Sequence, residues 1–276
     1  MPAISVIIPT FNRREPLTRA LRSVLAQTGT AYDIWVLDDG STDGTGDMLR
    51  RDFPSVQYAW FPNAGPAAAR NRGIKRSQSE WLAFLDSDDT WLPGKLRAQL
   101  EFFRTHPEYR IAQTEEIWIR NGVRVNPMKK HQKYGGQIFE KCLPLCLISP
   151  SAVMLQRSLL EETGLFDESF PACEDYDLWL RIACRYPVGL IAEPYVMKYG
   201  GHADQRSAEF PAMDQFRIRA LQKILTSGKL TAPQRQAALA ELETKSHIYM
   251  QGALKRGKRE EAEKIQTLLE SIPRAP

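Results

Sequence analysis

Four short apolar runs in the first 90 residues, each followed by a segment with helical spacing, constrain the fold of this chain most. Residues 16–27, for example, repeat apolar side chains at the spacing of one helix face. Short, continuous apolar strands that alternate with helices predict an α/β fold, in which a mostly parallel central sheet carries helices on both faces. The four runs, with the polar residues that end them, are 4–9, 32–41, 56–62 and 81–89.

Polar residues cluster where each predicted strand ends. Because ligands of such sheets collect beyond the carboxyl ends of the strands, these clusters predict one shared crevice. The strongest signal is in residues 81–91, where an apolar strand leads directly into Asp86, Asp88 and Asp89. These carboxylates repel one another unless water, a cation or a ligand lies between them. The clusters occupy 10–14, 38–45, 63–71 and 86–89.

The second half of the chain is less regular. It contains a predicted hairpin at Asn121-Gly122 and a helix that Gly164 ends, and from about residue 209 it reads as two or three amphipathic helices. We therefore expect an α/β domain and a C-terminal helical extension. Their predicted ranges are 1–208, with a nucleotide-binding half 1–110 and an acceptor half 111–208, and 209–276.

Charge and cysteine content narrow the class of protein. Lys and Arg number 37 against 33 Asp and Glu, an excess too small to indicate a nucleic-acid partner. The four cysteines form no C-x-x-C pair, and the first 15 residues lack the apolar run of a secretory signal. No apolar stretch approaches the ~20 residues that span a bilayer. These features predict a reduced, cytoplasmic protein whose membrane contact, if there is any, is peripheral.

Asp86-Ser87-Asp88 forms a D-x-D sequence at the end of a predicted strand. Alternate residues of an extended chain face the same side, so the two carboxylates can share one divalent cation, and their hard oxygens favour Mg²⁺ or Mn²⁺. The alternative is that an aspartate caps a helix that begins in residues 88–96. A cap uses one carboxylate and leaves the others unexplained, which favours the site.

Two further segments have an ordinary structural interpretation beside a functional one. Asp38 and Asp39, before Gly40, fit a tight turn, but a carboxylate there can also bind a base or a ribose. Gly65 and the small residues after it fit a close-packed helix start, or they let backbone N–H groups and Arg70 approach a diphosphate.

The segment 173–186 places Glu174 and Asp175 in the first turn of a predicted helix. The helix dipole favours acidic residues there whatever their function, and it also keeps a carboxylate ionised, as a general base requires. His202 lies in a glycine-containing loop with other polar residues, which makes it the histidine with the best case for a metal or diphosphate contact.

Taken together, these motifs resemble those of the family 2 glycosyltransferases over residues 3–205. The resemblance implies the GT-A nucleotide-sugar fold, with Asp175 as the catalytic base and Asp88 and His202 as metal ligands. Glu174, Trp179 and Arg181 would lie on the acceptor side or support it. The implied nucleotide-sugar contacts are Pro9, Thr10, Asn12, Arg13, Asp38, Asp39, Gly65, Arg70, Asp86 and Ser87.

The same resemblance implies a metal-dependent, inverting sugar transfer from a nucleoside diphosphate sugar, with UDP-sugars expected first, in cell-surface polysaccharide or glycolipid synthesis. The acceptor would be a glycan or a lipid-linked glycan, with its contacts expected in residues 127–146. Peripheral attachment to the inner face of the membrane and a homodimer stay open.

Three other interpretations compete with this one. The fold could bind a nucleotide sugar without transferring it, although the set of four aspartates, Asp39, Asp86, Asp88 and Asp175, argues against that. A nucleotidyltransferase would also use a metal, but it would usually carry a glycine-rich segment after the first strand, where residues 9–16 contain none. The helical extension could instead be a docking module.

Overall fold

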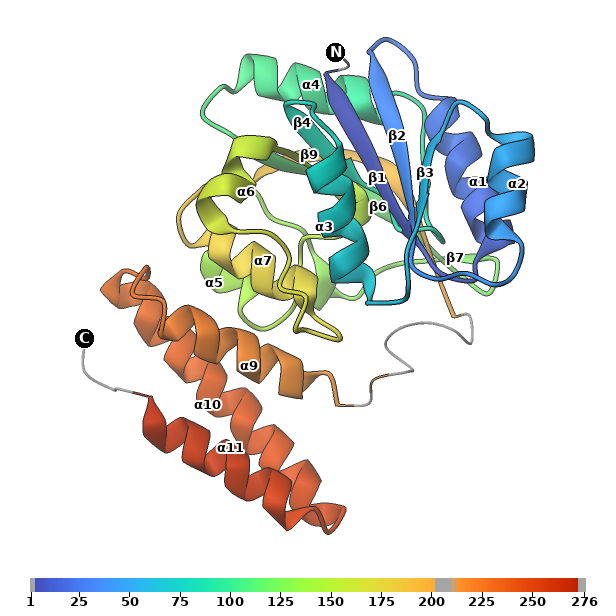
Figure 1. The fold of residues 1–276 in the computed structure, drawn as a ribbon. Coiled ribbons are helices and arrows are strands. Elements are labelled where there is room, and N and C mark those ends of the chain that lie inside the picture. Colours follow the sequence, from blue (N-terminus) through green and yellow to red (C-terminus); the bar gives the residue numbers. More distant parts are fainter. Residues whose placement is uncertain (1–2, 202–209, 211, 273–276) are drawn as a thin grey trace.

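The computed structural model describes residues 3–201, 210 and 212–272. Within them, one nine-stranded sheet has the order β3-β2-β1-β4-β8-β6-β9-β5, with β7 paired to β6. Figure 1 shows the sheet with helices packed against it and a group of three further helices at the C-terminal end.

The first half of the chain forms the parallel part of the sheet. β1 pairs with both β2 and β4, and β2 pairs with β3, all in parallel. The strands are β1 Ile4–Thr10, β2 Tyr32–Asp38, β3 Gln57–Trp60 and β4 Trp81–Phe84. The helices between them are α1 Arg14–Leu25, α2 Thr45–Asp52 and α3 Pro66–Arg76.

The second half adds antiparallel pairs. β8 pairs antiparallel with β4 and β6, whereas β6 and β9 pair in parallel. Its strands are β5 Thr90–Trp91, β6 Ile111–Arg120, β7 Val123–Val125, β8 Val153–Gln156 and β9 Gly189–Gly200. Its helices are α4 Lys95–Thr105, α5 Phe139–Cys142, α6 Arg157–Thr163 and α7 Glu174–Ala183, with short 3₁₀ turns at Lys129–His131 and Pro150–Ala152.

Two hydrophobic cores, one on each face of the sheet, confirm that helices cover both faces. Ile7 of β1 belongs to a core that also contains side chains of α3, α6, α7 and α9. Its neighbours Val6 and Ile8 belong to the other core, with side chains of α1, α2 and α4. Because successive side chains of a strand point to opposite faces, this alternation follows directly from the continuous apolar run.

Several local predictions are confirmed and one alternative is wrong. β6 and β7 form the predicted hairpin at Asn121-Gly122, and Gly164 ends α6 with φ +86°. None of the aspartates 86–89 caps a helix, because β5 follows them and α4 begins only at Lys95, after Gly94.

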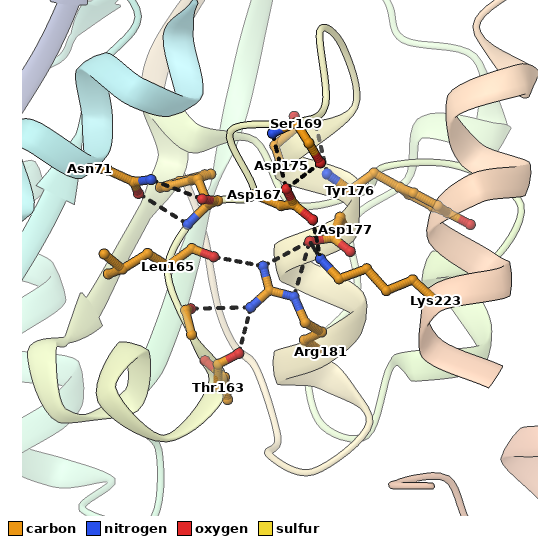
Figure 2. Close-up of polar contacts among 12 residues, drawn as sticks. Asn71, Thr163, Leu165, Asp167, Ser169, Asp175, Tyr176, Asp177, Arg181 and Lys223 are labelled. Atoms are coloured by element: carbon orange, nitrogen blue, oxygen red, sulfur yellow. Dashed lines mark hydrogen bonds and ion pairs between the residues drawn. The ribbon is translucent and has the colours of Figure 1, made fainter. Parts of the chain in front are cut away.

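The helical extension is α9 Asp214–Leu225, α10 Ala232–Lys255 and α11 Arg259–Ser271. It shares a core with the α/β domain, since Ile218 and Leu221 of α9 join the cluster that contains Trp179 of α7. Lys223 of α9 also pairs with Asp167 at 2.6 Å and with Asp177 at 3.0 Å (Figure 2). The boundary at residue 208 stays a prediction.

Among the described residues, no helix is both long enough and apolar enough to cross a membrane.

Candidate active site

A cavity of about 860 Å³ lies at the carboxyl ends of β1, β2 and β4. We call it the larger cavity. It confirms the sequence-based expectation that the polar strand ends meet in one crevice. Predicted site residues that line it are Pro9, Thr10, Asn12, Arg13, Asp39, Arg70, Asp86, Ser87, Asp88, Glu174 and Asp175.

Asp39 is held at the wall of this cavity by backbone groups. Its two carboxylate oxygens accept hydrogen bonds from the N–H groups of Ala64 and Gly65, at 2.9 and 2.8 Å. Gly65 has φ +91°, a conformation that other residues rarely adopt, so glycine is required here to present its N–H. Gly65 itself lies outside the cavity lining, and its contribution is to position Asp39.

Asp38 has a structural role rather than a place in the cavity. It is fully buried, and its carboxylate accepts hydrogen bonds from the Ser41 N–H at 2.8 Å and the Tyr58 hydroxyl at 2.9 Å. The turn interpretation is therefore confirmed for Asp38, whereas its neighbour Asp39 faces the cavity.

The loop after β1 is fixed to the loop after β2. Asn12 has φ +50°, its N–H donates to Ser41 at 2.8 Å, and its side-chain oxygen accepts from the Thr42 N–H at 2.8 Å. Next to it, Arg13 pairs with Asp88 at 2.7 Å, which links the loop to the end of β4. The buried Thr10 hydroxyl lines the cavity and has no hydrogen-bond partner among the described residues.

Arg70 joins two acidic residues that are far apart in the sequence. Its guanidinium pairs with Asp86 and with Glu174, both at 2.7 Å, and only 6% of its side chain is exposed. Burial raises the pKa of Glu174, which the charge of Arg70 partly offsets. The nearby carboxylates outweigh the cost of burying Arg70 and raise its pKa. Arg70 therefore fastens the end of β4 to the start of α7.

Asp89 also lines the larger cavity, although no individual role was predicted for it. Its carboxylate accepts hydrogen bonds from the Ser151 hydroxyl at 2.6 Å and from the Tyr199 N–H at 3.0 Å. Burial, followed by the charge of Asp88, raises its pKa. The sequence shows Asp89 as the third acidic residue after one strand, which was the available signal for a cavity position. Its hydrogen-bond partners, however, come from segments more than 60 residues away.

Trp179 and Arg181 do not line the larger cavity. Trp179 is buried in the core, with its ring edge-on to Phe166 at a centroid distance of 6.1 Å. Arg181 pairs with Asp177 at 2.8 Å and donates to the carbonyls of residues 163–165 (Figure 2). Both support α7, Trp179 through packing in the core and Arg181 through its ion pair and hydrogen bonds. His202 lies outside the described residues.

Hard carboxylate oxygens are present for a divalent cation, but they do not form a complete site. In the described part of the chain, no group of three or more His, Cys, Asp or Glu residues is arranged to hold a metal ion. Both D-x-D carboxylates are paired with an arginine at 2.7 Å, Asp86 with the buried Arg70 and Asp88 with the more exposed Arg13. Because Arg13 is less enclosed than Arg70, Asp88 is the carboxylate that a cation can reach more easily. The residues fit a cation that takes its remaining ligands from a bound diphosphate.

Asp175 lies at the N-terminus of α7 with both of its oxygens contacted. Oδ1 accepts from the Tyr176 N–H at 2.7 Å, and the Cys146 thiol lies 3.5 Å from Oδ2. Burial raises the pKa of Cys146 well above its usual value, so this group stays a neutral thiol that can donate to the carboxylate. Cys173, which precedes α7, has φ +63°, a conformation that non-glycine residues adopt mainly under tertiary constraint.

Sequence comparison identifies the family of this chain. The pattern described as "Glycosyl transferase family 2" matches residues 5–164, which is more than half of the chain. The chain belongs to glycosyl transferase family 2. The family resemblance seen in the motifs is confirmed, and the segments that line the larger cavity before residue 90 all lie inside the matched range.

Individual family members are similar over about two thirds of this chain. A glycosyltransferase of Rickettsia bellii is 33% identical over 198 residues, which are 69% of this chain and 28% of the relative. The chain thus spans under a third of that relative's length. The Escherichia coli UDP-Glc:α-D-GlcNAc-diphosphoundecaprenol β-1,3-glucosyltransferase WfaP is 33% identical over 189 residues, 66% of this chain and 70% of WfaP.

Solved structures share the fold at low sequence identity. Staphylococcus aureus TarS 1-349 in complex with UDP-GlcNAc has a TM-score of 0.71 and 20% identity, over 88% of this chain and 72% of TarS 1-349. The mannosyltransferase PcManGT from Pyrobaculum calidifontis, in complex with GDP-Man and Mn²⁺, has a TM-score of 0.61 and 18% identity, over 97% of this chain and 85% of PcManGT. The predicted GT-A fold class is confirmed.

A second cavity of about 320 Å³, the smaller cavity, adjoins the family's strand-end crevice. Pro150, Asp175, Lys198 and Tyr199 line both cavities. The smaller cavity also takes His131, Lys133, Leu145 and Cys146 from the segment where acceptor contacts were expected.

Two residues of the helical extension, which lies beyond the family match, contribute to these cavities. Met213, just before α9, lines the larger cavity, and Arg217 of α9 lines the smaller one. The sequence predicted the helices of the extension but assigned them no role in the site. The helices lack any recognisable ligand motif, so only the packing of α9 against α7 reveals this contribution.

Proposed function

We propose that this chain catalyses inverting transfer of a sugar from a nucleoside diphosphate sugar, a UDP-sugar in particular, to a hydroxyl group of a glycan or lipid-linked acceptor in cell-surface polysaccharide or glycolipid synthesis. The observation that carries the proposal is the position of Asp175, which lines both cavities. A donor in the larger cavity and an acceptor in the smaller one would meet at this carboxylate.

In the proposed reaction, the acceptor hydroxyl attacks C1 of the donor sugar while Asp175 takes its proton. The new C1–O bond forms as the bond from C1 to the diphosphate breaks, and the nucleoside diphosphate leaves with the bonding electrons. The Tyr176 N–H and the Cys146 thiol contact the two oxygens of Asp175 and would hold this carboxylate in place. A positioned base of this kind contributes about 10²- to 10⁴-fold to the rate.

The larger cavity is proposed to hold the donor. The carboxylate of Asp39 would accept from the base or the ribose, while the hydroxyl of Thr10, which has no partner among the described residues, would donate to the donor. Arg70 is engaged by two carboxylates, so we assign it to holding Asp86 and Glu174 in place rather than to direct neutralisation of the diphosphate.

Metal dependence is part of the proposal, with Asp88 as the protein ligand and Mn²⁺ or Mg²⁺ as the ion. When bound, the ion would supply positive charge to the leaving diphosphate. The Mn²⁺ in the PcManGT complex and the D-x-D carboxylates of this chain support this assignment. His202 as a further ligand stays a prediction, as do a homodimer, cytoplasmic residence and peripheral contact with the inner face of the membrane.

The first experiment is a donor screen by thermal shift and donor hydrolysis, using UDP-, GDP- and dTDP-sugars with Mn²⁺, Mg²⁺ or EDTA. A ligand that binds only the folded protein stabilises it by about 2.7 kcal/mol at 100 times its dissociation constant. We expect one nucleotide series to stabilise the chain in the presence of metal but not in EDTA. Asp88→Asn should lose this response, whereas Asp47→Asn, on the exposed surface of α2, should keep it.

Transfer to a lipid-linked acceptor then separates the proposal from its alternatives. A binding module would respond to the donor in the thermal shift but would never form a glycoside. A nucleotidyltransferase would release pyrophosphate from a nucleoside triphosphate. Failure to bind any donor sugar with either metal would overturn the proposed function.

A further inference from the structure

We propose that the smaller cavity binds a phosphate group of the acceptor, and that Arg217 of the helical extension is the residue that recognises it. This inference rests on the proposed function, since it assigns the chemistry of the acceptor to the cavity that adjoins Asp175. It goes beyond that function by making the extension a determinant of acceptor specificity.

Charge is the first observation. Among the described residues that line the smaller cavity, four are cationic and two are carboxylates, Glu116 and Asp175. The cationic side chains approach from β6, from the segment before α5, from β9 and from α9. Such convergence from several directions suits a tetrahedral, multiply charged phosphate better than a planar carboxylate with one charge. The four are Arg120, Lys133, Lys198 and Arg217.

Each of three cations has a carboxylate nearby: Lys133 has Glu116, Lys198 has Glu116 and Asp89, and Arg217 has Asp214. Lys133 lies 3.4 Å from Glu116, and the charges of Lys133 and Lys198 lower the pKa of Glu116 to about 2 despite its burial. The pKa of His131 is lowered as well, first by burial and then by Lys130, Lys198 and Arg120. Burial is the largest cause of this shift, and the added effect of Lys198 and Arg120, which line the cavity, is consistent with a site that attracts an anion.

Arg217 differs from the other cations in its position and its partners. Its Nη1 pairs with Asp214 at 2.9 Å, while its buried Nε has no hydrogen-bond partner among the described residues. Lys245 of α10 also lies 3.4 Å from Asp214, so that carboxylate keeps a cation if Arg217 is replaced. Substitution of Arg217 should therefore leave the fold intact.

The helix that carries Arg217 is fixed relative to Asp175. Lys223 of the same helix pairs at 3.0 Å with Asp177, which lies two residues after Asp175 on α7 (Figure 2). A phosphate held by Arg217 would therefore sit at a defined distance from the base. Since α9 lies beyond residues 5–164, the family pattern does not include this contact.

The test compares Arg217→Met with Arg219→Met, a matched control on the same helix whose guanidinium donates to Ser169. The acceptors are an alkyl N-acetylglucosaminyl diphosphate and the neutral alkyl N-acetylglucosaminide. We expect Arg217→Met to raise the KM of the diphosphate acceptor at least tenfold and to leave kcat, the donor KM and donor hydrolysis near the parent values. The KM of Arg217→Lys for the diphosphate acceptor should lie between the values of the parent and of Arg217→Met. The KM of Arg219→Met should match that of the parent.

The inference would be overturned if the parent chain used the neutral acceptor as well as the diphosphate acceptor, or if Arg217→Met left the KM of the diphosphate acceptor unchanged. Either result would leave the transferase function standing. A second readout needs no turnover. In an NMR pH titration, the diphosphate acceptor should raise the pKa of His131, assigned with a His131→Gln variant, in the parent chain but not in Arg217→Met. Absence of this rise in the parent chain would also overturn it.

Discussion

The two cavities that meet at Asp175 are built in different ways. The larger cavity takes most of its polar residues from the ends of consecutive parallel strands, so one rule of α/β sheets brings them together. The smaller cavity combines residues of β6, the segment before α5, β9 and α9, which no single rule unites. The proposed donor site therefore follows from the strand order of the fold, whereas the proposed acceptor site depends on tertiary packing.

The largest expected effect concerns the residue that both cavities share. Asp175→Asn keeps the size of the side chain and removes its ability to take a proton, so transfer should fall about 10²- to 10⁴-fold. Donor-dependent thermal stabilisation should persist, since the donor contacts stay in place. Transfer assays and thermal shift on the same preparation would check this, and a variant that binds donor and transfers sugar at the parent rate would remove Asp175 as the base.

The next effect tests whether the larger cavity depends on its buried ion pairs. Arg70→Met leaves Asp86 and Glu174 without their cation, and such a loss typically costs about 3–5 kcal/mol of folding free energy. Urea unfolding should show it. The double variant with Glu174→Gln should recover part of the loss, because one buried charge is removed with its partner.

Arg104→Met provides the matched surface control for that experiment. Arg104 pairs with Glu101 on the exposed face of α4, where both side chains are more than half accessible to solvent. Its loss should leave stability almost unchanged. Equal effects of Arg70→Met and Arg104→Met would contradict the structural role given to Arg70.

A smaller effect tests the charge balance of the other cavity through its pH dependence. The pKa of Glu116 is lowered to about 2, below the value of about 4.5 for the unfolded chain. Glu116 therefore contributes stability above pH 4.5, and this contribution is lost as the pH falls toward 2. The shift corresponds to at most about 3 kcal/mol.

Glu116→Gln is the variant that isolates this contribution. It should be less stable than the parent at pH 7 and should lose less stability between pH 5 and pH 2. Thermal unfolding across that range would measure both. Parallel pH curves for the two proteins would show that Glu116 titrates normally, and the cationic character assigned to the smaller cavity would lose its support.

The contrast between the cavities also explains what the sequence could predict. The apolar runs identified the parallel strands, and the acids after them located the larger cavity, because short-range patterns determine both. The same patterns could not separate Asp38 from Asp39, which differ only in which side of the strand end they face.

For a related physical cause, the sequence indicated only one segment of the smaller cavity, residues 127–146. The position of Cys146 beside Asp175, 29 residues away, depends on how α5 and α7 pack. The contribution of Arg217 depends on α9, whose amphipathic pattern predicts a helix but not the face on which it docks. Residues brought together by packing leave no spacing signal in one sequence.

The smallest expected effect tests whether the docking of α9 against α7 influences the smaller cavity alone. Lys223→Met removes the ion pairs with Asp167 and Asp177, but Asp177 keeps its ion pair with Arg181 at 2.8 Å. Because Lys223 is 38% exposed, the loss should cost about 0.5–1 kcal/mol. The acceptor KM should rise a few fold as α9 loosens, while the donor KM stays constant. Lys255→Met, at the far end of α10, is the control. If donor and acceptor KM rise together, the extension supports the whole crevice and the separation of the two cavities fails.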